Sequence, residues 1–297
     1  MEIKKKIFIT GISSNIMCAL TKLIDKDQYE LIGLTRNSVL YLSEKIKIIK
    51  GDITRPETFK QEIEGCYMIL HAAAVTHSFN PKKYGVVNFE STKELITLAK
   101  HYKVTRFVYL SSHTAGLENG EYAKSKYLAE NFLKKNFEKW TIIRPAELFG
   151  TNKNIGIEKL INSAINDTIH LCPIQVPIKL QPVHLQEAAL LMHNFIFESG
   201  CSIKTSAIIN GIRVYSYKEI LDTCIKLKGE RRDVIIPIPA NIMALLEKIA
   251  SFLPFYIGVI PDQVKRLYRQ PTNFDNSLHL TGRRSIETYL TIKIKKT

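Results

Sequence analysis

Short apolar segments alternate with helix-like segments through the first half of this 297-residue chain. Residues 6–10, 106–111 and 140–144 are examples of the apolar segments, and their apolar residues are consecutive rather than placed at every second position. Strands of this kind are buried on both faces, which is typical of parallel sheets covered by helices. Because parallel strands are joined by right-handed crossovers, the alternation predicts a doubly wound α/β sheet of the Rossmann type.

The predicted elements divide the chain into a larger and a smaller part. Strands are expected at residues 6–10, 29–34, 46–51, 67–74, 106–111 and 140–144, with helices at 14–25, 56–63, 88–102 and 122–136. Residues 1–165 are expected to form a dinucleotide-binding Rossmann domain, and the helix at 183–198 is expected to return to it. Residues 166–297 are expected to form mainly a smaller C-terminal α/β substrate-binding region, while 151–181 read as irregular. A chain of this length can hold one large domain or two closely associated ones.

Tyr122-Ala-Lys-Ser-Lys126 places a tyrosine and a lysine four residues apart at the start of a predicted helix. Positions i and i+4 share one helical face, so the ammonium of Lys126 is expected to lie near the Tyr122 ring oxygen. A nearby positive charge lowers a tyrosine pKa from its usual value of about 10, which favours acid–base exchange with a substrate oxygen. The hydroxyl pair Ser111-Ser112 ends the preceding strand and can orient the same oxygen. This combination is typical of hydride transfer between a nicotinamide and an alcohol or ketone, although Tyr-x-x-x-Lys alone also occurs on ordinary surface helices.

Taken together, the motifs resemble those of the short-chain dehydrogenase/reductase superfamily, specifically its extended or atypical extended branch, the NAD-dependent epimerase/dehydratase family. The resemblance runs through residues 5–150 and continues more weakly to about 290. It is carried by Thr10-Gly11, Gly51-Asp52, His71-Ala-Ala-Ala, Asn88 with Thr92, Phe107-Val-Tyr-Leu-Ser-Ser112, Tyr122-x-x-x-Lys126, Arg144-Pro145 with Phe149-Gly150, and Pro182-Val-His184.

The resemblance implies catalytic roles for Ser112, Tyr122 and Lys126. Tyr122 would be the acid/base, Lys126 would lower its pKa and bind the nicotinamide ribose, and Ser112 would orient the substrate oxygen. Ser111 and Thr114 remain alternatives to Ser112. The resemblance further implies a cofactor-binding set made of Thr10, Gly11, Ser13, Ser14, Asn15, Ile16, Arg36, Asp52, Ile53, Ala72, Ala73, Ala74, Tyr122, Lys126 and Pro145.

The glycine-rich loop departs from the family pattern. The family has Thr-Gly-x-x-Gly-x-x-Gly, whereas this chain has Ser14 and Met17 where the second and third glycines belong. The second glycine lets the backbone approach the pyrophosphate, and the third allows close packing of helix on strand. The Ser14 hydroxyl could reach a phosphate, and Met17 is expected in the core beneath a slightly displaced helix. The alternative is a Rossmann shell that no longer binds a dinucleotide.

Thr35-Arg36 stands where the family usually has an acidic residue after the second strand. An acidic side chain there binds the ribose 2′-hydroxyl, whereas an arginine suits a 2′-phosphate. NADP is therefore expected as the preferred cofactor, with NAD as the alternative. Asp52 fits the family position near the adenine, and its plainer role would be to cap a turn after Gly51.

Composition narrows the class of partner. Lys and Arg total 42 against 28 Asp and Glu, a net charge of +14, which suits anionic ligands. The excess is dispersed along the chain, so no nucleic-acid partner is expected. Five scattered cysteines without metal-ligand spacing predict reduced thiols, no metal site and a cytoplasmic location. Charges and Pro254 interrupt the apolar stretch at 242–260, so no integral membrane segment is expected.

The sequence therefore predicts an NADP-preferring oxidoreductase or epimerase/dehydratase with Tyr-Lys-Ser chemistry. Its expected partner is a small-molecule substrate, a nucleotide-linked sugar by analogy with the family, and a homodimer is compatible with the chain. The short link between Ser112 and Tyr122 resembles atypical family members. It leaves open a non-catalytic dinucleotide-binding regulatory or scaffold protein of the same fold.

Overall fold

The computed structural model describes residues 3–36, 45–151, 153–176, 179–198, 203–229, 233–252, 261–268 and 276–294. Its centre is an eight-stranded sheet in the order β12-β10-β6-β5-β4-β1-β2-β3, and every neighbouring pair is parallel. The strands are β1 (Lys5–Thr10), β2 (Tyr29–Thr35), β3 (Ile46–Lys50), β4 (Met68–His71), β5 (Arg106–Leu110), β6 (Trp140–Pro145), β10 (Thr205–Asn210) and β12 (Leu278–Thr281). The predicted doubly wound parallel sheet is confirmed, and the order of its first six strands is that of a Rossmann fold.

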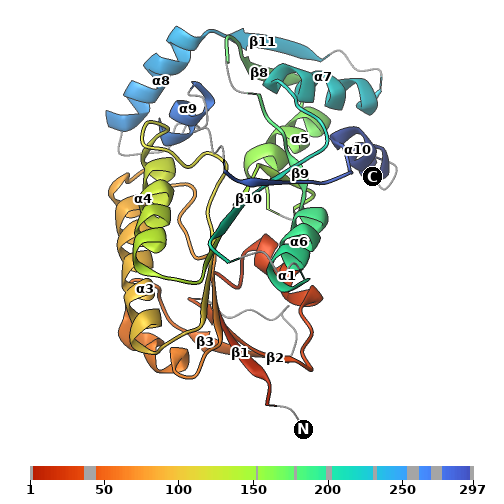
Figure 1. Ribbon diagram of the computed structural model, residues 1–297. Coiled ribbons are helices and arrows are strands. Elements are labelled where there is room, and N and C mark those ends of the chain that lie inside the picture. Colours follow the sequence, from red (N-terminus) through yellow and green to blue (C-terminus); the bar gives the residue numbers. More distant parts are fainter. Residues whose placement is uncertain are drawn as a thin grey trace.

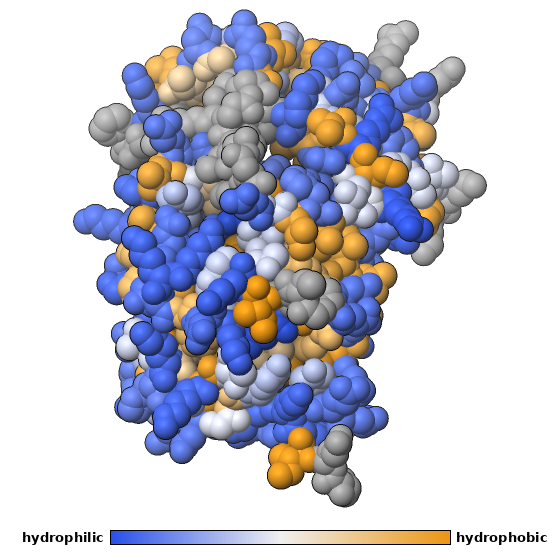
Figure 2. Space-filling view, in the orientation of Figure 1, coloured by the Kyte–Doolittle hydropathy of each residue, from blue (hydrophilic) through white to orange (hydrophobic). Residues whose placement is uncertain are grey.

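Helices cover both faces of this sheet (Figure 1). On one face α1 (Asn15–Leu23) packs beside α6 (Leu185–His193), and on the other lie α3 (Ser91–His101) and α4 (Glu121–Asn136). Successive residues of a strand therefore enter different cores: Ile7 and Ile9 face α1, whereas Phe8 faces α3. This two-sided burial explains why the strands are continuously apolar in sequence. In the view of Figure 2, polar residues cover most of the surface and apolar residues form separate patches.

Short elements complete the connections between sheet and helices. They are the 3-10 helices at Pro56–Thr58 and Lys60–Ile63, α2 (Lys82–Tyr84), and the π-helical turns at Gly85–Glu90 and Asn194–Glu198. The first π-helical turn leads directly into α3, and the second directly follows α6.

A smaller region lies beyond the carboxyl ends of the strands (Figure 1). It contains α5 (Gly156–Asn166), α7 (Tyr217–Lys228) and α10 (Ile286–Ile294) around a third core, with a parallel pair β8 (Ile169–Pro173) and β11 (Val234–Ile238). A second short pair joins β7 (Leu148–Phe149) to β9 (Val183–His184), and α8 (Ala240–Phe252) and α9 (Pro261–Tyr268) follow β11.

The expectation that residues 151–181 are irregular was wrong, because this stretch holds α5 and β8. Ile157, Ile161 and Ala164 of α5 are buried at helical spacing. The second half of the chain also supplies β10 and β12 to the main sheet and α6 to its face, so it contributes to both regions. No helix within the described residues is both long enough and apolar enough to span a bilayer.

A buried ion pair joins α4 to the sheet. Arg144 of β6 donates from Nε to Glu130 Oε1 at 2.8 Å and from Nη2 to Glu130 Oε2 at 2.6 Å, and both side chains are 1% exposed. Arg144 Nη1 also donates to Ser277 Oγ at 2.8 Å, and this serine contacts Ser206 of β10 at 2.9 Å. One guanidinium therefore connects the helix that carries the Tyr-x-x-x-Lys motif, a central strand and the segment that precedes β12.

Breaking this pair is expected to destabilise the protein severely. Arg144→Met leaves an uncompensated carboxylate in the core and should cost about 3–5 kcal/mol, whereas Glu130→Met combined with Arg144→Met should cost much less than the sum of the single changes. Urea unfolding of the four proteins in the cycle measures the coupling. Lys218→Met, which breaks the exposed Lys218–Asp222 pair, is the matched control and should leave the free energy of unfolding nearly unchanged. Additive single effects would contradict the proposed role of the pair.

Candidate functional site

The loops after β1 and β4 meet at the carboxyl edge of the sheet. Thr10 Oγ1 lies 2.6 Å from His71 Nδ1 and accepts a hydrogen bond from Ala73 N at 3.2 Å. Gly11 has a φ of +68°, and a Cβ on it would lie 2.6 Å from Ala73 N. Only glycine allows this close approach of the two backbones. The neutral imidazole of His71 is fixed here, because burial and then the charge of Lys126 lower its pKa to about 3.

The two departures in the glycine-rich loop have separate structural outcomes. Ser14 is the N-cap of α1, and its Oγ accepts a hydrogen bond from Met17 N at 3.3 Å. Met17 is buried in the core between α1, the sheet and α6, as expected from the sequence. The α1 N-terminus, with partly exposed Ser13, Ser14 and Asn15, retains the backbone geometry that favours an anion.

The remaining predicted cofactor residues follow the same edge. Arg36 is exposed directly after β2, and Asp52 is partly buried after β3, where its Oδ1 accepts from Thr54 N and Thr54 Oγ1, both at 2.9 Å. Burial opposes ionisation of Asp52, but the Thr54 hydrogen bonds and the charge of Arg36 hold its pKa below the usual value. Asp52 thus caps a turn as well as standing beside Arg36. Ile16 and Ile53 are buried, whereas Ala72, Ala73, Ala74 and Pro145 are partly exposed.

Ser112 and Tyr122 are brought together at the end of β5 and the start of α4. The Ser112 hydroxyl lies 2.9 Å from Thr114 Oγ1 and also hydrogen-bonds the Tyr122 side chain. Burial raises the pKa of Tyr122, while the charge of Arg266 and the Ser112 hydrogen bond act to lower it. Among the three hydroxyls considered from sequence, Ser112 and Thr114 therefore form one cluster with Tyr122, and Ser111 is buried separately.

Lys126 lies deeper than the sequence suggested. Its Nζ donates to the Leu110 carbonyl at 2.8 Å and lies 4.7 Å from the centre of the Tyr109 ring. Burial lowers the pKa of Lys126 to about 7, although the charge of Glu130 opposes this. The expected lowering of the Tyr122 pKa is not found in this structure: the pKa is raised, and the largest cationic contribution against this comes from Arg266.

A side-chain network holds the start of α4 against the loop after β4. Asn88 pairs with the Val75 backbone, accepting from its N–H at 2.8 Å and donating to its carbonyl at 2.9 Å. Asn88 Nδ2 also donates to Ser125 Oγ at 3.1 Å, and Ser125 Oγ donates to the Tyr122 carbonyl at 2.7 Å. The loop after β4 and the start of α4 are thereby fixed relative to one another.

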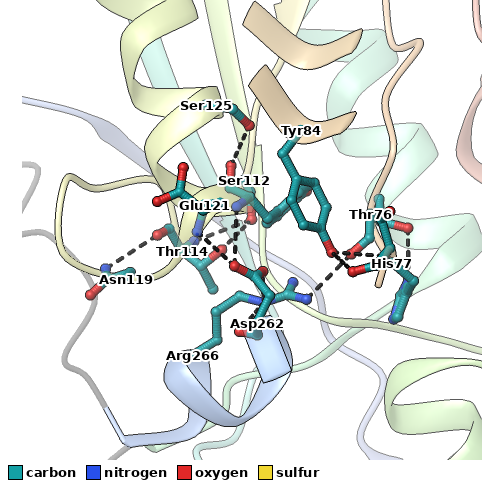
Figure 3. Close-up of polar contacts among 12 residues, drawn as sticks. Thr76, His77, Tyr84, Ser112, Thr114, Asn119, Glu121, Ser125, Asp262 and Arg266 are labelled. Carbon is teal, nitrogen blue, oxygen red and sulfur yellow. Dashed lines mark hydrogen bonds and ion pairs between the residues drawn. The ribbon is translucent and has the colours of Figure 1, made fainter. Parts of the chain in front are cut away.

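Two residues of α9 complete the site, and the sequence reasoning missed both (Figure 3). Gly120, at a φ of +92°, has no side chain to cap α4, and Asp262 Oδ1 accepts from Glu121 N at 2.6 Å and from Tyr122 N at 3.4 Å. Arg266 places its guanidinium carbon 4.7 Å from the centre of the Tyr122 ring. Asp262 follows a proline and reads in sequence as a residue of its own helix N-terminus, so no local signal links it to Tyr122.

His184 caps α6 and packs against two aromatic rings. Its Nδ1 accepts from Gln186 N at 3.3 Å as the N-cap of α6, and its ring packs against Phe149 and Tyr289. Cys18, Cys66, Cys172 and Cys224 are free thiols. Cys201 lies outside the described residues.

The fold and the site together are those of a dinucleotide-binding Rossmann protein, and comparison with known proteins agrees. The family model described as NAD(P)H-binding matches residues 17–166, so the chain belongs to the NAD(P)H-binding family. The resemblance to the extended short-chain dehydrogenase/reductase superfamily is confirmed.

Curated relatives are similar over parts of their length. Sterol-4-alpha-carboxylate 3-dehydrogenase, decarboxylating, of Saccharomyces cerevisiae is 29% identical over 36% of this chain and 38% of its own. The mitochondrial NADH-ubiquinone oxidoreductase 40 kDa subunit of Neurospora crassa is 20% identical over 65% of this chain and 50% of its own. The chain therefore spans a half or less of the length of these relatives.

Solved structures share the whole fold at low identity. The UDP-glucuronic acid 4-epimerase of Bacillus cereus in complex with NAD superimposes with a TM-score of 0.66 at 16% identity, covering 89% of this chain and 95% of its own. The likeness extends beyond the Rossmann sheet into the smaller region and concerns the fold.

The buried Lys126 predicts a pH-dependent contribution to stability. Its pKa is about 7 in the folded protein, whereas the unfolded chain keeps the proton up to about pH 10.4. Between these values the unfolded state binds more protons, so the free energy of unfolding contributed by Lys126 rises with pH. The stability of the parent relative to Lys126→Met should therefore increase between about pH 7 and about pH 9.5, as measured by urea unfolding. The exposed Lys124→Met on the same helix should show no such trend, and a difference for Lys126→Met that does not change with pH would contradict the assignment.

Proposed function

We propose that this protein is an NAD(P)-dependent oxidoreductase or epimerase that acts at a hydroxyl- or keto-bearing carbon, with NADP as the preferred cofactor. The observation that carries the proposal is the cluster of Ser112, Tyr122 and buried Lys126 at the carboxyl edge of a Rossmann sheet. A nucleotide-linked sugar is the first substrate class to test, by analogy with structural neighbours such as the UDP-glucuronic acid 4-epimerase.

The residues at the edge of the sheet fit a dinucleotide. The Gly11 turn, which a Cβ would close, and the α1 N-terminus would hold the pyrophosphate, with Arg36 and Asp52 on the adenosine side. Tyr122 and Lys126 would face the nicotinamide end. The bound cofactor supplies or accepts a hydride at the substrate carbon.

Tyr122 handles the proton in this scheme. Because burial raises its pKa, the phenol keeps its proton at neutral pH and is ready to donate it to a carbonyl oxygen during reduction. Ser112 holds the same oxygen through its hydroxyl, and Thr114 in turn orients Ser112. Lys126 is fixed below by the Leu110 carbonyl and supplies a proton-exchanging amine whose pKa is near neutrality.

A non-catalytic dinucleotide-binding subunit remains the second candidate. One curated relative is named as a subunit of NADH-ubiquinone oxidoreductase, which favours testing this role. Mass analysis of the cofactor retained through purification separates the two enzymatic possibilities, since an epimerase keeps its dinucleotide and a reductase exchanges it.

Replacing Tyr122 by Phe tests the chemistry directly. The change removes one oxygen and little packing, so the fold and cofactor affinity should survive while turnover falls by about 10²–10⁴. Tyr127→Phe on the same helix removes the same atom away from the proposed cluster and should keep normal turnover. Steady-state rates with any substrate found in a screen provide the measurement, and unchanged turnover in Tyr122→Phe rules out the mechanism.

The cofactor preference depends on Arg36. NADPH should bind more tightly than NADH, and Arg36→Ala should narrow the gap by about 1–3 kcal/mol, the contribution of a charge-assisted phosphate contact. Titration of nicotinamide fluorescence measures both affinities. Arg55→Ala removes an equal charge near Asp52 and should leave the difference between the NADPH and NADH affinities nearly unchanged. Equal affinities in the parent protein would be evidence against an NADP preference.

A further inference from the structure

Arg266 is the cation that faces Tyr122 from the smaller region. It lies in the second turn of α9, far from Tyr122 in sequence, and its guanidinium carbon is 4.7 Å from the centre of the Tyr122 ring. Its side chain is 13% exposed. Figure 3 shows Arg266 reaching from α9 toward Thr76 of the loop after β4, so the guanidinium lies between the dinucleotide edge and the smaller region.

The polar contacts that Arg266 makes within the described residues are all long. Nη2 donates to the Thr76 carbonyl at 3.3 Å, Nε donates to the Asp262 carbonyl at 3.4 Å, and Nε lies 3.4 Å from Asp262 Oδ2. Charge-assisted pairs of arginine and carboxylate are usually shorter, at about 2.7–2.9 Å, and often bidentate. The position of the Arg266 guanidinium is therefore set by α9 and the Tyr122 ring. Its interaction with the one carboxylate it contacts here, that of Asp262, is weak.

The main hydrogen bond of Asp262 is made to α4 rather than to Arg266. Its Oδ1 makes the 2.6 Å hydrogen bond that caps α4. Its Oδ2 is buried, has no hydrogen-bond partner among the described residues, and lies 3.4 Å from Arg266 Nε. Asp262 can thus keep its capping role while a second carboxylate takes up the guanidinium. The acidic residue whose charge acts on Tyr122 is Glu147, which is exposed.

We propose that Arg266 forms a subsite for a carboxylate carried by the substrate close to the reacting carbon. The inference rests on the proposed function in one respect, that Tyr122 binds the oxygen at the reacting carbon. A planar carboxylate matches the guanidinium fork of Arg266. The carboxylate of the substrate would take the place of the Asp262 carboxylate, which Arg266 contacts only at 3.4 Å. The site thereby distinguishes acids from neutral substrates, with a uronic acid as the acidic form of a nucleotide-linked sugar.

Two pairs of ligands that differ only in this group test the subsite. UDP-glucuronic acid is compared with UDP-glucose, and 3-hydroxybutyrate with 1,3-butanediol, by calorimetric titration of the protein with NADPH present. The acid of at least one pair should bind about 10- to 100-fold more tightly than its neutral partner, as expected for a charge-assisted contact. The second pair contains no nucleotide. If only the nucleotide-sugar assignment is wrong, 3-hydroxybutyrate still binds more tightly than 1,3-butanediol. If the carboxylate subsite is wrong, neither pair shows a preference for the acid.

Three variants separate recognition from structural support. Arg266→Met should abolish the preference for the acid, while the exposed Arg213→Met should retain it. Asp262→Asn keeps an amide oxygen able to cap α4 and removes the competing charge, so it should bind the acid more tightly than the parent does. A merely structural role for the pair predicts weaker binding in both Arg266→Met and Asp262→Asn.

Two outcomes would overturn the proposal. In the first, the acids and neutral ligands of both pairs bind the parent protein equally well. In the second, Arg266→Met weakens UDP-glucose and UDP-glucuronic acid by the same factor, which would show that Arg266 binds the diphosphate. Thermal unfolding of each variant identifies any loss of the folded state. If Arg266→Met does not fold, Arg266→Lys is used in its place. This variant keeps the charge but not the planar fork, and it should lose most of the preference for the acid.

Discussion

The buried pair of Arg144 and Glu130 fixes the helix on which the proposed chemistry depends. Both charges are removed from water, which is favourable only when the geometry is good and the remaining hydrogen-bonding groups are satisfied. The two short contacts between guanidinium and carboxylate meet the first condition, and the third contact of Arg144, to Ser277, contributes to the second. Glu130 lies one turn beyond Lys126 and two turns beyond Tyr122 on α4, so anchoring Glu130 sets the depth and rotation of both.

The electrostatic surroundings of Tyr122 come from both halves of the chain. Lys126 lies below it, buried and held by the Leu110 carbonyl, and Arg266 covers its ring from the smaller region. Asp262 caps the same helix from outside, which compensates for the absence of a capping side chain at Gly120. Helix α4 therefore has its N-terminal cap only when α9 is in place, and this makes the smaller region part of the proposed site.

Features encoded over short distances in sequence were predicted well. The continuously apolar strands, the burial of Met17 and the proximity of Ser112 to Tyr122 follow from periodicity and spacing within one βαβ unit. Helix α5 was missed because the prolines of 151–181 suggested an irregular segment, although Ile157 and Ile161 already have helical spacing. The roles of Asp262 and Arg266 could not be read from sequence, since each acts on a helix about 140 residues away through tertiary packing alone. The pKa of Tyr122 was mispredicted for a related reason: helical spacing gave its neighbour on α4 but not the burial that dominates the shift.

The most direct test of the account is a crystal structure determined with NADPH bound. We expect the pyrophosphate at the Gly11 turn and the α1 N-terminus, the 2′-phosphate beside Arg36, and the nicotinamide ribose within hydrogen-bonding distance of Tyr122 and Lys126. A dinucleotide bound away from Tyr122, or crystals that take up no dinucleotide at saturating concentration, would contradict the assignment of this edge as a hydride-transfer site.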